Sequence, residues 1–133
     1  MLQDPIVLLV DDYQDALEMY EEYLRFRGYS VVTASSGAQA VDLARTTRPA
    51  LILMDLQMGG MTGTEAMQIL RADPAHSDVQ IVALTAHALD GDRRAALAAG
   101  FDEVLPKPCL PDDLVAAIGR LLAGTRTRSS RSS

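Results

Sequence analysis

The chain has 133 residues, 48% of them hydrophobic, and a formal net charge of −6. This length suits one domain with a hydrophobic core, and no apolar run reaches the roughly 18 residues of a membrane helix. A single cysteine excludes an internal disulfide and a thiolate metal cluster. An acidic protein repels nucleic-acid phosphates, so we expect no direct DNA binding, and no membrane partner.

Predicted strands and helices alternate along the chain. An apolar run at residues 6–10 predicts the first strand, and an Asp rather than a basic segment precedes it, which favours a cytoplasmic protein over a secreted one. Apolar residues spaced by three and four at 15–28 predict the first helix, which ends at a glycine. The elements predicted after it are strand 30–34, helix 37–49, strand 51–54, helix 62–74, strand 81–84, helix 89–100, strand 102–106 and helix 111–124.

The order of these elements predicts the fold. Near-continuous apolar runs are typical of strands buried on both faces, and strand–helix alternation is typical of a parallel sheet. We expect an α/β fold: one doubly wound five-stranded parallel sheet in the flavodoxin-like order 2-1-3-4-5, with helices on both faces. The domain is expected over residues 1–124. Residues 125–133 are rich in Ser and Arg, which predicts a disordered tail.

Chemically active residues follow the predicted strands. Asp11 and Asp12 follow the first strand, Asp55 the third, Thr85 the fourth and Lys107 the fifth. Because ligands of open α/β sheets bind beyond the carboxyl ends of the strands, we expect these side chains to meet. Carboxylates that meet repel one another unless a cation lies among them, and hard oxygen ligands favour Mg²⁺.

A divalent cation beside a carboxylate nucleophile predicts phosphoryl transfer. Asp55 is the candidate nucleophile, since aspartyl phosphate is an established intermediate. Thr85 would bond one phosphoryl oxygen, and the compact ammonium of Lys107 would pair with another. Lys107 is the only lysine of the chain and has a proline on each side. A cis bond between Lys107 and Pro108 would help to aim its side chain.

Each of these residues has an ordinary explanation when taken alone. Asp11 and Asp12 can cap the first helix, Asp55 can cap a loop, Thr85 can be an ordinary strand-end residue, and Lys107 can be a surface charge. Their joint placement at the ends of four strands is what favours a site.

Nearby residues also have ordinary explanations. We expect Tyr20 and Tyr23 to be half-buried residues of the first helix. Cys109 is expected to be a small apolar residue, and His87 to be solvated. A role for His87 with Gln57 in orienting a hydrolytic water is the alternative.

Four stretches together resemble the receiver domain of bacterial two-component response regulators: VLLVDDYQDALEMYEEYLRFRGYSV, LILMDLQMGGMTG, IVALTAHA and AGFDEVLPKP. The likeness runs from about residue 5 to residue 123. The roles that it implies are Asp55 as phosphoacceptor, Asp11, Asp12 and Asp55 with the backbone carbonyl of Gln57 as ligands of Mg²⁺, Thr85 as the switch hydroxyl and Lys107 as the phosphate-pairing lysine.

The resemblance implies a phosphorylation-controlled switch of a phosphorelay, stand-alone or of the hybrid-kinase type. It would be no enzyme beyond its own phosphorylation and dephosphorylation. The implied partners are a histidine kinase or a His-containing phosphotransfer protein, and a downstream protein at the face formed by residues 86–110. Val104 replaces the family's switch aromatic, so we expect the signal to leave as a displacement of residues 86–99.

Three other functions are alternatives to this interpretation. One is a receiver-like interaction module that never uses phosphate. A phosphatase of the haloacid dehalogenase type would need a second acid where Gln57 stands. A nucleotide or flavin protein would need a Gly-rich loop after the first strand, and VDDYQDA is not Gly-rich.

Overall fold

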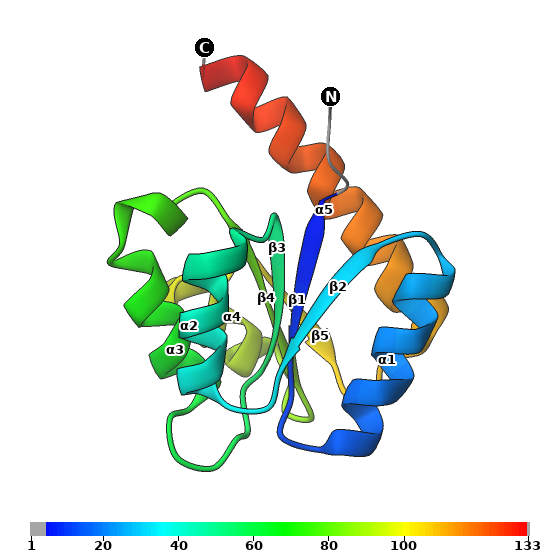
Figure 1. Ribbon diagram of the computed structural model, residues 1–133. Helices are drawn as coiled ribbons and strands as arrows, with labels where there is room; N and C mark the ends of the chain where they lie inside the picture. The colour runs from blue at the N-terminus through cyan, green and yellow to red at the C-terminus, as the bar shows by residue number, and fades with distance from the viewer. Residues whose placement is uncertain (1–4, 133) are drawn as a thin grey trace.

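The computed structural model describes the backbone of residues 5–132 and the side chains of residues 5–123. The strands are β1 (Ile6–Val10), β2 (Ser30–Ala34), β3 (Leu51–Asp55), β4 (Gln80–Thr85) and β5 (Glu103–Pro106). They form one parallel sheet in the order β2-β1-β3-β4-β5 (Figure 1), which confirms the predicted fold class. Within residues 5–132, no helix combines the length and the apolar character needed to cross a membrane.

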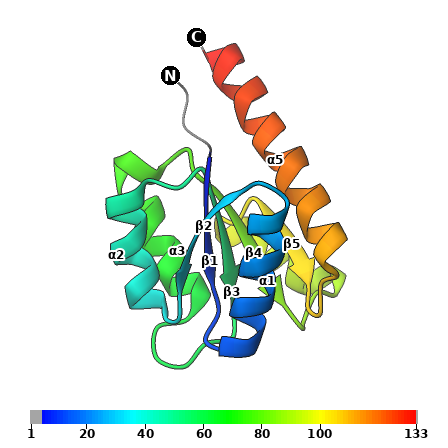
Figure 2. The ribbon, with the colours of Figure 1, turned by 45° about the vertical axis from the view of Figure 1, so that its right-hand side comes forward.

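Helices cover both faces of the sheet. They are α1 (Gln14–Phe26), α2 (Gly37–Thr47), α3 (Gly63–Arg71), α4 (Asp90–Ala99) and α5 (Pro111–Ser132), with a short 3-10 helix η1 (Pro74–His76). Figures 1 and 2 show α2, α3 and α4 on one face and α1 and α5 on the other. This arrangement agrees with the two-sided covering that strand–helix alternation predicts.

The two covered faces explain why β1 is apolar throughout. Val7 and Leu9 pack into the cluster under α1 and α5, whereas Leu8 and Val10 pack into the cluster under α2, α3 and α4. All four side chains are 0% exposed. Because successive residues of a strand point to opposite faces, a sheet covered on both sides buries every residue of its central strands.

Two strands extend one residue beyond the predicted ends. β3 includes Asp55 and β4 includes Thr85, because Asp55 pairs with Leu84 in the ladder and the Leu56 amide donates to the Leu84 carbonyl. Both candidate site residues therefore sit on rigid backbone. The helix η1 was not predicted from the sequence; the Asp73 side chain caps it by accepting a hydrogen bond from the Ala75 amide.

The C-terminal helix differs from the predicted ending at Gly124. α5 continues to Ser132, since Thr, Ser and Arg do not break a helix as proline does. The side chains of residues 124–133 lie outside the described residues, as do residues 1–4 entirely. The boundary between a domain at 1–124 and a tail at 125–133 therefore stays a prediction.

Candidate functional site

Three carboxylates meet at the carboxyl edge of the sheet. Val10 pairs with Met54 in the parallel ladder, so Asp11 and Asp55 lie at the same edge. Asp11, Asp12 and Asp55 each place an oxygen so that these atoms lie within 4.8 Å of one another. Asp11 is 1% exposed and Asp55 is 3% exposed. The fold therefore concentrates negative charge where little water reaches it.

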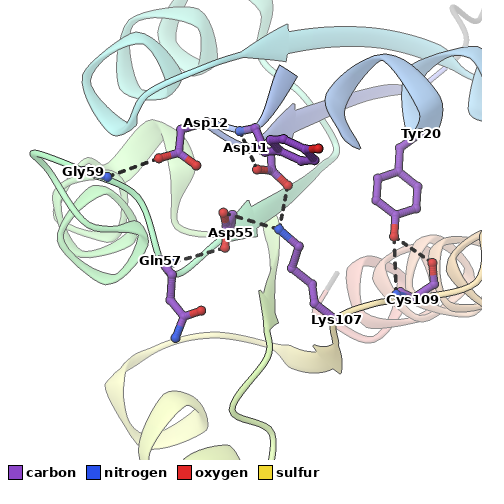
Figure 3. Close-up of polar contacts among 9 residues, drawn as sticks. Asp11, Asp12, Tyr20, Asp55, Gln57, Gly59, Lys107 and Cys109 are labelled. Carbon is purple, nitrogen blue, oxygen red and sulfur yellow. Dashed lines mark hydrogen bonds and ion pairs between the residues drawn. The ribbon is translucent and has the colours of Figure 1, made fainter. Parts of the chain in front are cut away.

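Lys107 supplies positive charge to this cluster (Figure 3). Its Nζ lies 2.8 Å from Asp11 Oδ2 and 3.5 Å from Asp55 Oδ2. The peptide bond between Lys107 and Pro108 is cis, as predicted. Burial opposes the charged form of Lys107, but the bond to Asp11 and the charges of Asp11 and Asp55 raise its pKa. One lysine thus faces three acids, which leaves net negative charge in the site.

Backbone amides orient the acidic pair. Asp11 Oδ1 accepts a hydrogen bond of 2.9 Å from the Tyr13 amide, and Asp12 Oδ2 accepts one of 3.3 Å from the Gly59 amide. The helix α1 has Tyr13 as its N-cap and no side-chain cap. Asp11 and Asp12 therefore do not cap the helix, which removes the ordinary explanation for this pair.

Asp55 is held at the end of β3. Its Oδ1 accepts a hydrogen bond of 3.1 Å from the Gln57 amide, while the Gln57 side chain points away from the carboxylates (Figure 3). Burial raises the pKa of Asp55, and the neighbouring charge of Asp11 raises it further, against the opposing effects of the Gln57 amide and Lys107. The ionised form is thus disfavoured, so a further cation beside Asp55 would stabilise it.

Thr85 is joined to both the lysine segment and the next loop. It is 3% exposed, its Oγ1 accepts a 3.0 Å bond from the His87 amide, and its carbonyl accepts a 2.8 Å bond from the Lys107 amide. A hollow of about 340 Å³ lies beside it, lined in part by Gln57, His87 and three alanines of α4. The short alanine side chains leave this space open next to the site.

Tyr20, which was expected to be only half buried, lies close to the site. Tyr20 is 3% exposed, and its hydroxyl meets the backbone of Cys109, just beyond Lys107 (Figure 3). Tyr23, by contrast, bonds to the exposed side chain of Asp112. Two features of the sequence could have indicated this contact: the helical spacing of Tyr20 and the small residue Cys109 after the Lys-Pro pair.

The start of α3 packs directly against the site. A capping box between Thr62 and Glu65 fixes this end of the helix. A Cβ added to Gly63 would lie 2.4 Å from the carbonyl oxygen of Asp55 and 3.0 Å from the Cα of Leu56. Only glycine therefore fits at this position without moving the end of β3.

Substitution of Gly63 by alanine is expected to destabilise the protein and disturb Asp55. The added methyl group meets backbone, which cannot turn aside, so we expect a loss of about 2 kcal/mol in the free energy of unfolding. Denaturant titration measures the loss. The matched control is Gly59→Ala, because nothing lies within 4 Å of a Cβ at Gly59. Equal midpoints for the two variants would show that the close approach is not tight in solution.

Comparison with known proteins identifies similar sequences over almost the whole chain. A family model described as the response regulator receiver domain matches residues 7–119. The transcriptional regulatory protein PrrA of Mycobacterium leprae is 39% identical over 132 residues, which are 97% of this chain and 56% of PrrA. The chain spans about half the length of the curated relatives that it matches.

Solved structures agree with the sequence match. The chemotaxis protein CheY4 of Vibrio cholerae has a TM-score of 0.84 at 30% identity, covering 89% of this chain and 98% of that one. The receiver domain of a sensor histidine kinase from Pseudomonas aeruginosa has a TM-score of 0.83 at 36% identity, covering 91% of this chain and 99% of that one. That structure contains a magnesium ion coordinated in its active-site cleft.

These relatives correct the expected set of partners. We expected no direct DNA binding, on the basis of the acidic composition. The relatives PrrA and YvrH are transcriptional regulatory proteins, and this chain covers only 56% and 55% of them. That expectation is wrong, because the charge of the matched segment carries no information about what a longer protein binds.

Proposed function

We propose that Asp55 is the phosphoacceptor of this chain, which belongs to the response regulator receiver domain family, the phosphorylation-controlled module of two-component signalling. One observation carries the assignment to Asp55. This carboxylate ends the central strand β3, is 3% exposed, and lies 3.5 Å from Lys107 Nζ with two further carboxylates beside it. A phosphate-independent module would have no use for this set of groups.

The reaction assigns a separate task to each residue. A carboxylate oxygen of Asp55 attacks phosphorus, the phosphorus–nitrogen bond of a phosphohistidine donor breaks, and the imidazole nitrogen leaves with the electron pair. Lys107 pairs with one phosphoryl oxygen and limits the charge that accumulates. Thr85, whose hydroxyl now accepts from the His87 amide, donates to another phosphoryl oxygen. The chain would catalyse only this transfer and the hydrolysis of the resulting acyl phosphate, in which water attacks phosphorus and the Asp55 carboxylate and inorganic phosphate are released.

The acidic residues fit Mg²⁺. Asp11, Asp12 and Asp55 offer three carboxylate oxygens within 4.8 Å of one another, and a single lysine leaves them under-neutralised. Mg²⁺ prefers oxygen ligands and keeps part of its water, and it would neutralise charge on the transferred oxygens. The carbonyl of Gln57 is the fourth ligand that we propose, by analogy with the family.

Hydrolysis of the phosphorylated form would be governed by two residues of the adjoining hollow. Gln57 and His87 both line the space beside Thr85, and His87 is exposed. We propose that they orient a water molecule toward a phosphoryl group on Asp55, which requires the Gln57 side chain to turn from its present direction away from the carboxylates. We place the protein in the cytoplasm, where a phosphohistidine donor would meet it.

Titration with Mg²⁺ tests the metal site. The amide signals of residues 10–13 and 55–59 should shift first, because their backbone carries or contacts the ligands. Binding should weaken as the pH is lowered from neutral, since the carboxylates must be ionised to act as ligands. Asp12→Asn should weaken binding strongly, whereas Asp42→Asn, an exposed change on α2, should not. An unchanged spectrum in these two segments at several millimolar would refute the site.

A further inference from the structure

The buried hydroxyl of Tyr20 makes two hydrogen bonds to one residue of another element. It donates to the Cys109 carbonyl at 2.7 Å and accepts from the Cys109 amide at 3.3 Å. Tyr20 belongs to α1, and Cys109 lies 89 positions away between β5 and α5. Both residues are buried in the same apolar cluster, Tyr20 at 3% exposure and Cys109 at 7%. The pair of bonds therefore fixes backbone where water offers little replacement.

The bonded backbone is the continuation of the segment that carries Lys107. On its N-terminal side, the Lys107 amide donates to the Thr85 carbonyl at 2.8 Å. On its C-terminal side, Cys109 is bonded to Tyr20. The segment between these two points places Lys107 Nζ at 2.8 Å from Asp11 and 3.5 Å from Asp55. Tyr20 thus holds one end of the short segment that aims the lysine.

The helix that presents Tyr20 also begins beside the acidic pair. α1 starts at Gln14, directly after the Asp11-Asp12 segment, and the Asp11 carboxylate accepts from the Tyr13 amide. The Tyr20 hydroxyl therefore ties the element next to the carboxylates to the loop that supplies the opposing charge. Figure 3 shows the Tyr20 side chain extending from α1 to the Cys109 backbone, in the loop that also carries Lys107.

We propose that Tyr20 is a positioning residue for phosphoryl transfer, which acts by holding the Cys109 backbone so that Lys107 stays aimed at Asp55. The assignment rests on the proposed function, in which Lys107 pairs with a phosphoryl oxygen. A misplacement of about 1 Å in a group that stabilises a transition state can cost on the order of 100-fold in rate. The loop that carries Lys107 is held at two points, by Thr85 and by Tyr20. Loss of the Tyr20 bonds alone is expected to lower the rate of phosphorylation about tenfold.

The test is Tyr20→Phe, which removes one oxygen and keeps the ring in the core. The matched control is Tyr23→Phe, which removes a hydroxyl from the same helix. That hydroxyl contacts Asp112 and Arg27 but not the Lys107 segment. The first readout is the initial rate of phosphorylation by acetyl phosphate at saturating Mg²⁺. We expect it to fall about tenfold in Tyr20→Phe and to stay within about twofold of wild type in Tyr23→Phe.

The second readout uses the fact that Lys107 is the only lysine of the chain. Protein labelled with carbon-13 at the lysine Cε gives one lysine signal, which reports on Lys107 alone. In Tyr20→Phe this signal should move or broaden in the free protein, and its change on adding beryllofluoride should be smaller than in wild type. In Tyr23→Phe the lysine signal of the free protein and its change on adding beryllofluoride should both match those of wild type.

Each outcome is decisive. A lower unfolding temperature in Tyr20→Phe with an unchanged lysine signal and rate would mean that Tyr20 only packs, and would overturn the proposal. The same holds if both variants behave alike. If wild-type protein takes up no phosphoryl group, the proposed function fails, but the lysine signal of the free protein still tests the positioning. Should Tyr20→Phe not fold, 3-fluorotyrosine placed at position 20 keeps the ring and strengthens the donor, and it must then move the lysine signal.

Discussion

Asp55→Asn should abolish the formation of the acyl phosphate. Wild-type protein incubated with Mg²⁺ and acetyl phosphate should gain one phosphoryl group that is released by base, and the variant should gain none. The amide of asparagine cannot serve as the attacking carboxylate oxygen, and the neighbouring Asp11 is engaged by Lys107 at 2.8 Å. Intact-protein mass spectrometry measures the number of groups added.

Loss of labelling in this variant would not be an effect of unfolding. Burial raises the pKa of Asp55, so its ionised form at neutral pH lowers the stability of the folded state relative to the unfolded state. A neutral asparagine removes this cost, and we expect Asp55→Asn to unfold at a temperature equal to or above that of wild type. The exposed Asp42→Asn should be labelled normally. Base-stable phosphate on a serine, present in both proteins, would refute Asp55 as the acceptor.

Lys107→Ala should destabilise the protein in the absence of divalent cations. The substitution leaves Asp11 and Asp55 buried without their partner, and breaking a buried ion pair by removing one member is strongly destabilising. The Lys107 side chain is 24% exposed, so we expect about 2 kcal/mol, below the cost for a fully buried pair. The pKa of Lys107 is raised, so the stabilising charge is fully present at neutral pH and is lost only in strongly alkaline solution.

Magnesium separates this effect from a packing defect. Mg²⁺ should stabilise Lys107→Ala more than it stabilises wild type, because the ion then supplies the neutralising charge that the lysine provided. Lys107→Arg retains the charge and should recover most of the stability. It should still be phosphorylated more slowly, since a planar guanidinium does not fit the place of a compact ammonium. The unfolding temperatures of wild type, Lys107→Ala and Lys107→Arg are measured with EDTA and with Mg²⁺. If Mg²⁺ raises the unfolding temperature of wild type and Lys107→Ala equally, the electrostatic explanation is contradicted.

The sequence by itself determined the sheet and the membership of the site. Strands buried on both faces must be apolar at every position, so their runs could be recognised and ordered without a structure. Parallel strands bring their carboxyl ends to one edge, which predicted that Asp11, Asp12, Asp55 and Lys107 would meet. Local rules of this kind need only the spacing of residues along the chain. The single lysine between two prolines was visible for the same reason.

The tertiary structure alone decided what holds these residues in place. The bonds of Tyr20 to Cys109 join positions 89 residues apart, and the amide of Gly59 reaches Asp12 across 47 residues. The contact of Gly63 with the Asp55 carbonyl likewise depends on the approach of α3 to β3. No periodicity encodes such contacts, because they follow from how finished elements pack. For that reason Tyr20 was expected to be an ordinary half-buried helix residue, although its hydroxyl lies buried against the loop that carries Lys107.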